Sequence, residues 1–166
     1  MRPSRLRNLK WSALAAIGLA ASSTVLGGPP RQSPTAGQAA PAWQARSVWD
    51  GAYSEEQAKR GEPMYRRYCA SCHGGMLTGG ESASPLTGST FTSNSNGLAI
   101  DDLFERIRRS MPQDRPGRLS RQQNADILAY VLSVNKFPAG KTELPVQSEY
   151  LKQIRFEAMR PDARGK

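Results

Sequence analysis

The residues of this chain best suited to hold a cofactor are its 2 Cys and its 1 His, which lie together in the stretch Cys69-Ala70-Ser71-Cys72-His73. On a helix, residues three apart share a face, so Cys69 and Cys72 can form thioether bonds to the two vinyl groups of one porphyrin. His73 then lies beside the ring, where an imidazole can ligate the iron. This C-x-x-C-H spacing is the attachment pattern of c-type haem. The stretch therefore predicts one covalently attached haem c.

Other uses of two cysteines and a histidine fit less well. A structural zinc site takes about four Cys or His ligands, and the whole chain has 2 Cys and 1 His. A thioredoxin-like redox pair needs a strand-to-helix turn at its C-x-x-C, whereas Glu55–Tyr68 is polar, helical in pattern and without a β-branched run. A plain local disulfide would leave His73 without a role. Haem is the favoured interpretation, and a haem-free dithiol or disulfide is the alternative.

The helix expected to carry the motif begins after Ser54. The stretch Ser54–Gln57 has the form of a capping box, in which the serine and glutamine side chains bind backbone N–H groups at the start of a helix. Gly61 has no side chain, which would let a second helix approach closely. Pro63 removes one i to i−4 hydrogen bond, so a kink is expected between Gly61 and Met64.

A second candidate iron ligand follows the short helix expected over Ile100–Ser110. Met111-Pro112 comes directly after it, and the proline stops the helix and fixes the chain where the methionine emerges. The chain's only His is already used, so a second histidine ligand is excluded. Met111 lies 38 residues after His73 and has room to reach the other face of the haem; filling a gap in the core is its alternative role. The other methionines downstream of the leader are worse placed: Met64, Met76 and Met159.

The stretch Gly74–Leu98 is rich in Gly, Ser, Thr and Asn, and we expect a long loop there. A structureless loop of this length is uncommon in a compact domain unless it wraps something that orders it. A haem would serve, with Pro85, Leu86 and Phe91 as apolar contacts in the haem pocket. Ordinary loop packing is the alternative role for these three side chains.

Two further helices are expected towards the C-terminus. Apolar residues recur at helical spacing over Arg121–Lys136, with Ser120 as the N-cap, which predicts a core helix that packs on the first helix at Gly61. Val146–Met159 shows the same spacing, so a final amphipathic helix is expected to lie on the domain or on a partner.

The chain divides into four segments by composition. Residues 1–27 have a basic start and an apolar stretch of about 16 residues, typical of a secretory signal peptide, with an uncleaved N-terminal anchor as the alternative. Residues 28–47 are rich in Pro, Ala and Gln and are expected to form a disordered linker. Residues 48–143 make up the globular domain, and residues 144–166 the final amphipathic helix and tail. A signal peptide predicts export to the periplasm, with membrane attachment only if the apolar segment is uncleaved.

The net charge of +9 comes from 23 Lys and Arg against 14 Asp and Glu. Four of the basic residues lie within the first ten, so the balance without the leader is +5. This moderate excess, without aromatic residues interleaved among the arginines, argues against nucleic acid as a partner. Five arginines that flank Met111 could steer an acidic partner to the nearby haem edge, or simply complement the dipole of a helix: Arg106, Arg108, Arg109, Arg115 and Arg118.

The order of these features resembles that of class I c-type cytochromes over roughly Ser54–Lys136: Gly61, Cys69–Gly74, Pro85-Leu86, Met111-Pro112 and Ala129-Tyr130. The resemblance implies an all-α fold, a small cytochrome c domain in which three or more helices and long irregular loops wrap around one covalently bound haem. It also implies axial ligation of the iron by His73 and Met111, and transfer of single electrons. In this family the loop proline that Pro85 matches gives its carbonyl to the proximal imidazole.

Three flanking stretches are loosely similar to cytochrome modules attached to or accompanying pyrroloquinoline-quinone dehydrogenases: Val48–Gly51, Phe137–Gly140 and the C-terminal tail. This similarity implies redox proteins as partners, such as a quinoprotein dehydrogenase or a terminal oxidase. Iron with two axial ligands has no open position for a substrate, so an electron carrier, or the electron-accepting subunit of a dehydrogenase, is expected and not an enzyme. A small peroxidase-like haem enzyme is the alternative if Met111 is not a stable ligand, and a haem-free dithiol–disulfide oxidoreductase is the second.

Overall fold

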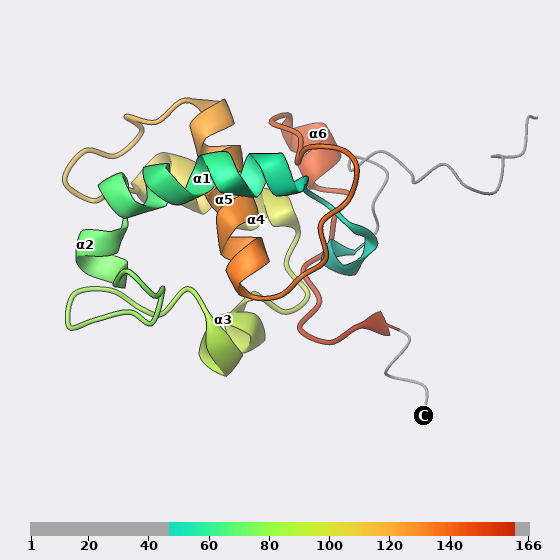
Figure 1. The fold of residues 1–166 in the computed structure, drawn as a ribbon, viewed down its shortest axis with the longest axis horizontal. Helices are drawn as coiled ribbons and strands as arrows, with labels where there is room; N and C mark the ends of the chain where they lie inside the picture. The colour runs from blue at the N-terminus through green and yellow to red at the C-terminus, as the bar shows by residue number, and fades with distance from the viewer. Residues whose placement is uncertain (1–46, 162–166) are drawn as a thin grey trace, which may run out of the picture. The chain divides into compact units, whose positions relative to one another are not determined.

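The computed structural model describes residues 47–161, which contain a 3₁₀ turn and six α-helices (Figure 1). The β pairing among these residues is limited to isolated bridges. The elements are η2 (Val48–Asp50), α1 (Glu55–Tyr68), α2 (Ala70–His73), α3 (Gly88–Ser95), α4 (Ile100–Ser110), α5 (Arg121–Val134) and α6 (Ser148–Leu151). The predicted all-α fold class is confirmed. No helix in this part of the chain is long and apolar enough to cross a membrane. The predicted signal peptide (1–27) and nearly all of the predicted linker (28–47) lie outside the described residues.

Helix α1 begins as predicted, although its capping differs in detail. The Ser54 hydroxyl accepts a hydrogen bond from the backbone N–H of Gln57 at 3.1 Å. The Gln57 side chain does not return to Ser54; it is fully buried and bonds both the N–H and the carbonyl of Leu144, at 2.7 and 3.1 Å. Pro63 lies inside α1, and the helix continues through it to Tyr68. The sequence of α1 therefore fixes both the start of the helix and an anchor for the chain beyond α5.

The crossing of α1 with α5 is the central packing contact, and it lies at Gly61 as predicted. A Cβ atom added at Gly61 would collide with the backbone carbonyl of Asp126, so only glycine allows this approach. The Asp126 carboxylate accepts two hydrogen bonds from Arg60 of α1, at 3.1 and 3.3 Å. Tyr65 and Tyr130 pack beside the crossing with ring centroids 5.4 Å apart.

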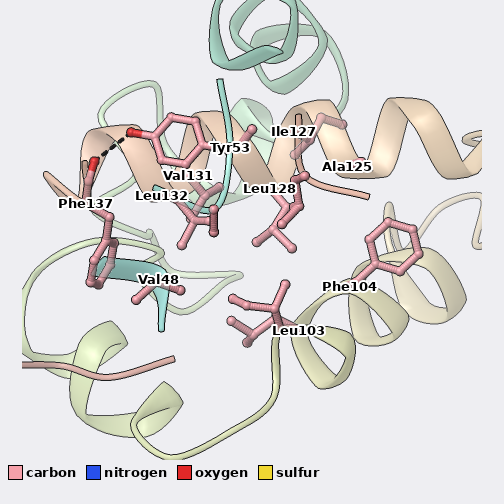
Figure 2. Close-up of a cluster of buried hydrophobic side chains, with 14 of the residues drawn as sticks. Val48, Tyr53, Leu103, Phe104, Ala125, Ile127, Leu128, Val131, Leu132 and Phe137 are labelled. Carbon is pink, nitrogen blue, oxygen red and sulfur yellow. Dashed lines mark hydrogen bonds between the residues drawn. The ribbon is translucent and has the colours of Figure 1, made fainter. Parts of the chain in front are cut away.

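Helices α4 and α5 match the predicted ranges closely and share one apolar core. Ser120 caps α5 and forms a complete capping box with Gln123. Figure 2 shows Leu103 and Phe104 of α4 near the apolar side chains of α5. Glu105 of α4 and Arg121 of α5 form an ion pair of 2.9 Å at the rim of this core.

Two expectations from the sequence, one of a loop and one of a helix, are wrong. The predicted loop Gly74–Leu98 contains α3, whose Phe91 is buried. The predicted helix Val146–Met159 is reduced to the single turn of α6. The backbone beyond α6 pairs with other segments instead, because Phe156 N–H donates to Leu98 O and Ile154 O accepts from Ile100 N–H, both at 2.8 Å.

The side chains of this tail belong to the same core as the rest of the domain. Leu151, Ile154 and Phe156 are fully buried. The Phe156 ring packs edge-on against Phe137 and Phe91, with centroids 5.0 and 5.6 Å apart. The described part of the tail therefore closes the domain and does not stand apart from it.

Candidate haem-binding site

The Cys-Ala-Ser-Cys-His motif lies where α1 passes into α2. The N–H of Cys69 donates to Tyr65 O at 2.8 Å and ends α1. The carbonyl of Cys69 then accepts from the N–H groups of Cys72 and His73, at 3.2 and 2.9 Å, so the motif folds into one tight turn. Both thiols are free, with Cys69 half-buried and Cys72 exposed. The site thus holds the two separate thiols that thioether formation consumes.

The imidazole of His73 is oriented by a backbone carbonyl. Its Nδ1 lies 2.9 Å from the carbonyl oxygen of Ser84. Because a carbonyl can only accept, Nδ1 carries the proton and the lone pair lies on Nε2, the nitrogen that an iron ligand needs. The carbonyl expected from the family resemblance was that of Pro85, which is wrong by one residue.

The loop after the motif explains this difference. Gly79 N–H donates to His73 O at 2.9 Å, and a turn closes where Gly80 N–H donates to Ala83 O at 3.0 Å. Because these bonds fold the loop back beneath the imidazole, the carbonyl directly after the turn, that of Ser84, lies against Nδ1. A sequence pattern cannot distinguish this carbonyl from its neighbour.

Tyr65 ties the end of the motif to α1, a role that the sequence did not suggest. Its hydroxyl donates to the carbonyl of Gly74 at 2.7 Å, and the side chain is fully buried. Burial raises the pKa of Tyr65 well above its usual value, so the hydroxyl remains protonated and keeps donating. The turn that carries His73 is therefore held from one side by the loop and from the other by α1.

A cavity of about 610 Å³ opens beside the motif. All seven side chains that the sequence placed at the haem line it: Cys69, Cys72, His73, Pro85, Leu86, Phe91 and Met111. Helices α4 and α5 add further apolar walls: Leu103, Ile107, Ile127, Leu128 and Val131. A mostly apolar cavity of this size with a few convergent polar groups is typical of a cofactor site. Two thiols and an oriented imidazole at its edge fit a haem c.

Met111 is the methionine that the fold brings to this cavity. It follows the last residue of α4, its N–H still donates to Ile107 O at 2.9 Å, and Pro112 lines the cavity beside it. The other methionines between residues 47 and 161 do not line the cavity. Met64 packs against the core, and Met76 and Met159 are 78% and 59% exposed. Met111, which was chosen from the sequence by elimination, is therefore also the methionine of the described residues that lines the cavity.

Polar residues at the cavity include several that sequence reasoning did not assign to it. Arg67 and Tyr68 precede the first cysteine, and their adjacency to the motif was the available signal. Asn94 and Ser95 come from α3, which was not predicted. Gln113 and Asp114 come from the loop before α5, whereas Arg106 and Arg118 are two of the arginines that were expected from the sequence near the haem edge.

The thiol chemistry does not favour a dithiol oxidoreductase. Burial raises the pKa of the Cys69 thiol to about 11, and the nearby Cys72 adds to the shift. Reactive cysteines of such enzymes have lowered pKa values, because the thiolate is the nucleophile. The environment of Cys69 therefore disfavours the thiolate that such an enzyme needs.

Comparison with known proteins agrees with the site. The family model described as cytochrome c oxidase, cbb3-type, subunit III matches residues 56–131, which run from α1 through the motif and Met111 into α5. This stretch is a class I c-type cytochrome domain, and such domains bind covalently attached haem c and use it to transfer electrons. No curated protein matches the chain.

Among solved structures, the chain is similar to the sulfane dehydrogenase SoxCD from Paracoccus pantotrophus, with 22% identity and a TM-score of 0.44. The match covers 66% of this chain and 55% of the other, so the chain spans about half the length of the protein that it matches.

Proposed function

We propose that this protein is an exported monohaem cytochrome c that carries single electrons between a periplasmic dehydrogenase, or another respiratory donor, and an acceptor. In this proposal Cys69 and Cys72 hold the haem, and His73 and Met111 are its axial ligands. The observation that carries the proposal is that these four side chains line one cavity, with Nε2 of His73 left free for iron. Pro85, Leu86 and Phe91 supply apolar contacts to the haem.

The residues around the cavity have separate tasks in this mechanism. When bound, the haem supplies an iron that gains and loses one electron. The Ser84 carbonyl fixes the tautomer and orientation of His73 and makes its imidazole a stronger donor. Met111, as a softer ligand, would favour the reduced state. Side chains of α4 and α5 such as Leu103 and Leu128 keep water from the ring.

The proposed pair of iron ligands distinguishes a carrier from an enzyme. If His73 and Met111 both held the iron, it would have no position for peroxide or another substrate, which favours electron transfer. Export rests on the basic and apolar character of residues 1–27. A quinoprotein dehydrogenase fits as donor from the similarity of the flanking stretches, and the cbb3-type oxidase description of the matching family supports a terminal oxidase as acceptor.

A visible and near-infrared spectrum of the exported protein, with its Met111→Ala variant, tests the proposal. The wild type should keep its haem on a denaturing gel and show a sulfur-to-iron band when oxidised. Met111→Ala should lose that band, bind small ligands at the opened position and have a lower potential. A wild-type band that does not stain for haem on the denaturing gel would overturn the haem proposal. Ligand binding and peroxidase turnover by the wild type itself would replace the carrier with the peroxidase-like enzyme.

A further inference from the structure

One aromatic ring at the cavity holds two arginines. The guanidinium carbons of Arg67 and Arg118 lie 5.3 and 4.9 Å from the centroid of the Tyr68 ring. Arg67 belongs to the last turn of α1, whereas Arg118 comes from the segment before α5. The two cations repel each other, and the attraction of each one to the tyrosine ring offsets part of that repulsion. We call Arg67, Tyr68 and Arg118 the arginine cluster.

The arginine cluster lies at the cysteine edge of the cavity. All three residues line the cavity, and Tyr68 directly precedes Cys69. Both arginines are exposed, and so is Cys72. The cavity edge where covalent attachment occurs is therefore the edge that solvent, or another protein, can reach.

The positive excess of the domain is concentrated at the cavity. Residues 47–161 contain 15 Lys and Arg against 13 Asp and Glu, an excess of two. The cavity lining alone has three arginines, Arg67, Arg106 and Arg118, against one carboxylate, Asp114. The lining thus accounts for the whole excess, and the rest of the described domain is balanced. Such a separation of charge steers association.

Carboxylates of the chain itself do not neutralise this surface. Within residues 47–161, neither Arg67 nor Arg118 takes part in an ion pair, whereas Arg108 and Arg109 bind Glu105 at 2.7 and 2.8 Å. Of the five arginines expected from the sequence to border the haem edge, Arg106 and Arg118 line the cavity. Arg118 remains available there, while Arg108 and Arg109 are paired on α4 and do not line the cavity.

The carboxylates of a bound haem do not account for the arginine cluster either. In protohaem the two vinyl groups and the two propionates lie on opposite edges of the ring. A cluster that adjoins Cys69 lies at the vinyl edge. Arg106, the third arginine of the cavity lining, comes from α4 and does not belong to the arginine cluster.

We infer that the arginine cluster is the docking surface for an acidic redox protein, an inference that rests on the proposed electron-transfer function. Carboxylates of the partner bind Arg67 and Arg118, which brings the partner's redox group to the cysteine edge of the haem. One electron then leaves the donor and reduces the iron, or leaves the iron and reduces the acceptor. No proton or bond is exchanged. Paired charges of this kind raise the association rate more than the final affinity.

Oxidation of the reduced holoprotein by three probes tests this inference: hexacyanoferrate(III), tris(phenanthroline)cobalt(III) and oxidised plastocyanin of acidic type. Wild type is compared with the double reversal Arg67→Glu/Arg118→Glu. The matched control is Lys141→Glu/Lys152→Glu, which makes the same change in charge at two exposed lysines outside the cavity lining. A neutral pair, Arg67→Gln/Arg118→Gln, provides a milder variant if the reversal lowers the yield.

The anionic probe and the acidic protein should lose rate together. At 10 mM salt we expect the arginine reversal to slow both by about tenfold or more and to accelerate the cationic cobalt probe. The neutral pair should show intermediate effects and the lysine control less than about a twofold change. At 1 M salt, where the Debye length is about 3 Å, the differences should nearly vanish. The sulfur-to-iron band should persist in every variant, and each rate is compared at the potential measured for that variant.

Three results would overturn the inference while leaving the proposed function intact. Equal rates for the arginine reversal and the lysine control would move docking elsewhere. Loss of the sulfur-to-iron band in the reversal would assign the arginines to the haem itself. Salt-dependent binding to phosphatidylglycerol vesicles that the reversal abolishes, with unchanged plastocyanin rates, would assign the surface to anionic lipid. A wild type without haem would instead overturn the proposed function.

Discussion

Two glycines mark the two places where the backbone passes closest to itself near the haem site. At the crossing of α1 and α5, a Cβ on Gly61 would collide with the carbonyl of Asp126. In the loop after the motif, a Cβ on Gly79 would lie 2.7 Å from Pro85 N and 2.8 Å from Ala83 O. The first contact joins two regular helices, while the second joins two parts of an irregular loop. We call the crossed helices α1 and α5 the frame, and the loop between His73 and Pro85 the ligand loop. Both depend on a glycine that lets two backbone segments approach closely.

The difference between them lies in what each contact positions. The crossing at Gly61 sets the distance between α1 and α5 and is supported by the ion pair of Arg60 with Asp126. The contact at Gly79 supports the segment whose Ser84 carbonyl orients His73. A substitution at the crossing should therefore lower the stability of the fold, whereas a substitution in the loop should mainly change the geometry of the iron ligand.

Gly61→Ala should give the largest effect. The added methyl group meets backbone and not a flexible side chain, so the helices must move apart. We expect a loss of about 3 kcal/mol or more in the free energy of unfolding, at the upper end for overpacked cores. Denaturant unfolding of the holoprotein measures it. Gly75→Ala is the matched control, because a Cβ there meets nothing within 4 Å. Equal stability of the two variants would show that the crossing tolerates a wider separation.

Gly79→Ala should come second and should change the haem site more than the fold. Gly79 has φ +78°, which side chains rarely adopt, and its contacts are backbone. We expect about 1–3 kcal/mol of destabilisation from strain and crowding. Displacement of the Ser84 carbonyl would weaken its bond to His73 and make the imidazole a poorer donor, so the potential should rise. Potentiometric titration beside Gly75→Ala measures this. A potential equal to that of the control would show that Ser84 does not tune the ligand.

The contrast between frame and loop also separates what the sequence could predict from what it could not. The bounds of α4 and α5 and the contact at Gly61 followed from caps, from apolar periodicity and from the lack of a side chain. All seven candidate site residues line one cavity. They could be found from the sequence because a short cysteine–histidine motif and a methionine before a proline are recognisable from neighbouring residues alone. Helix α3 was missed because its Gly-Ser-Thr-Asn composition has no helical period.

The tail was assigned wrongly for a related reason. The spacing of Leu151 and Ile154 suits a helix, but α6 ends at Leu151, and the backbone of Ile154 pairs with that of Ile100 instead. Periodicity reports which side chains are apolar and not which backbone groups find distant partners. The identity of the carbonyl that holds His73 depends on one turn at Gly80 and Ala83, and no pattern of residue types encodes it.

Glu105→Gln should weaken the frame by a smaller amount. Glu105 accepts hydrogen bonds from Arg108, Arg121 and Arg109, and the bond from Arg108 contributes most to lowering the carboxyl pKa from 4.5 to about 2. After allowance for screening by solvent, we expect a loss of about 1–2 kcal/mol at pH 7. The control Glu62→Gln removes an exposed pair with Arg66 and should cost about 0.5 kcal/mol or less.

The pH dependence follows from the lowered pKa of Glu105. In the unfolded chain this carboxyl binds a proton near pH 4.5, and in the folded protein only near pH 2. Its contribution to stability is therefore complete above pH 4.5 and is lost as the pH falls towards 2. The difference between wild type and Glu105→Gln should shrink over that window in thermal unfolding. A difference that persists at pH 2 would assign the effect to packing.

Tyr65→Phe should give the smallest loss of stability and the sharpest test of how frame and loop are joined. The substitution removes one hydrogen bond, from the hydroxyl to Gly74 O at 2.7 Å, and leaves that carbonyl with the bond from the Leu77 N–H at 3.1 Å. We expect a loss of about 1 kcal/mol. Tyr53→Phe is the matched control, because its hydroxyl donates to Phe137 O, also at 2.7 Å, away from the motif (Figure 2).

The two tyrosine variants should be equally stable but should differ at the haem. Gly74 follows His73, so loss of the Tyr65 bond removes the link between α1 and the end of the motif turn and should broaden the range of imidazole orientations. We expect a shifted potential and broader haem-proton resonances in Tyr65→Phe alone, measured by voltammetry and proton NMR of the holoprotein. If both variants lose the same stability and neither changes the haem signals, the loop alone holds His73, and the frame positions only the walls of the cavity.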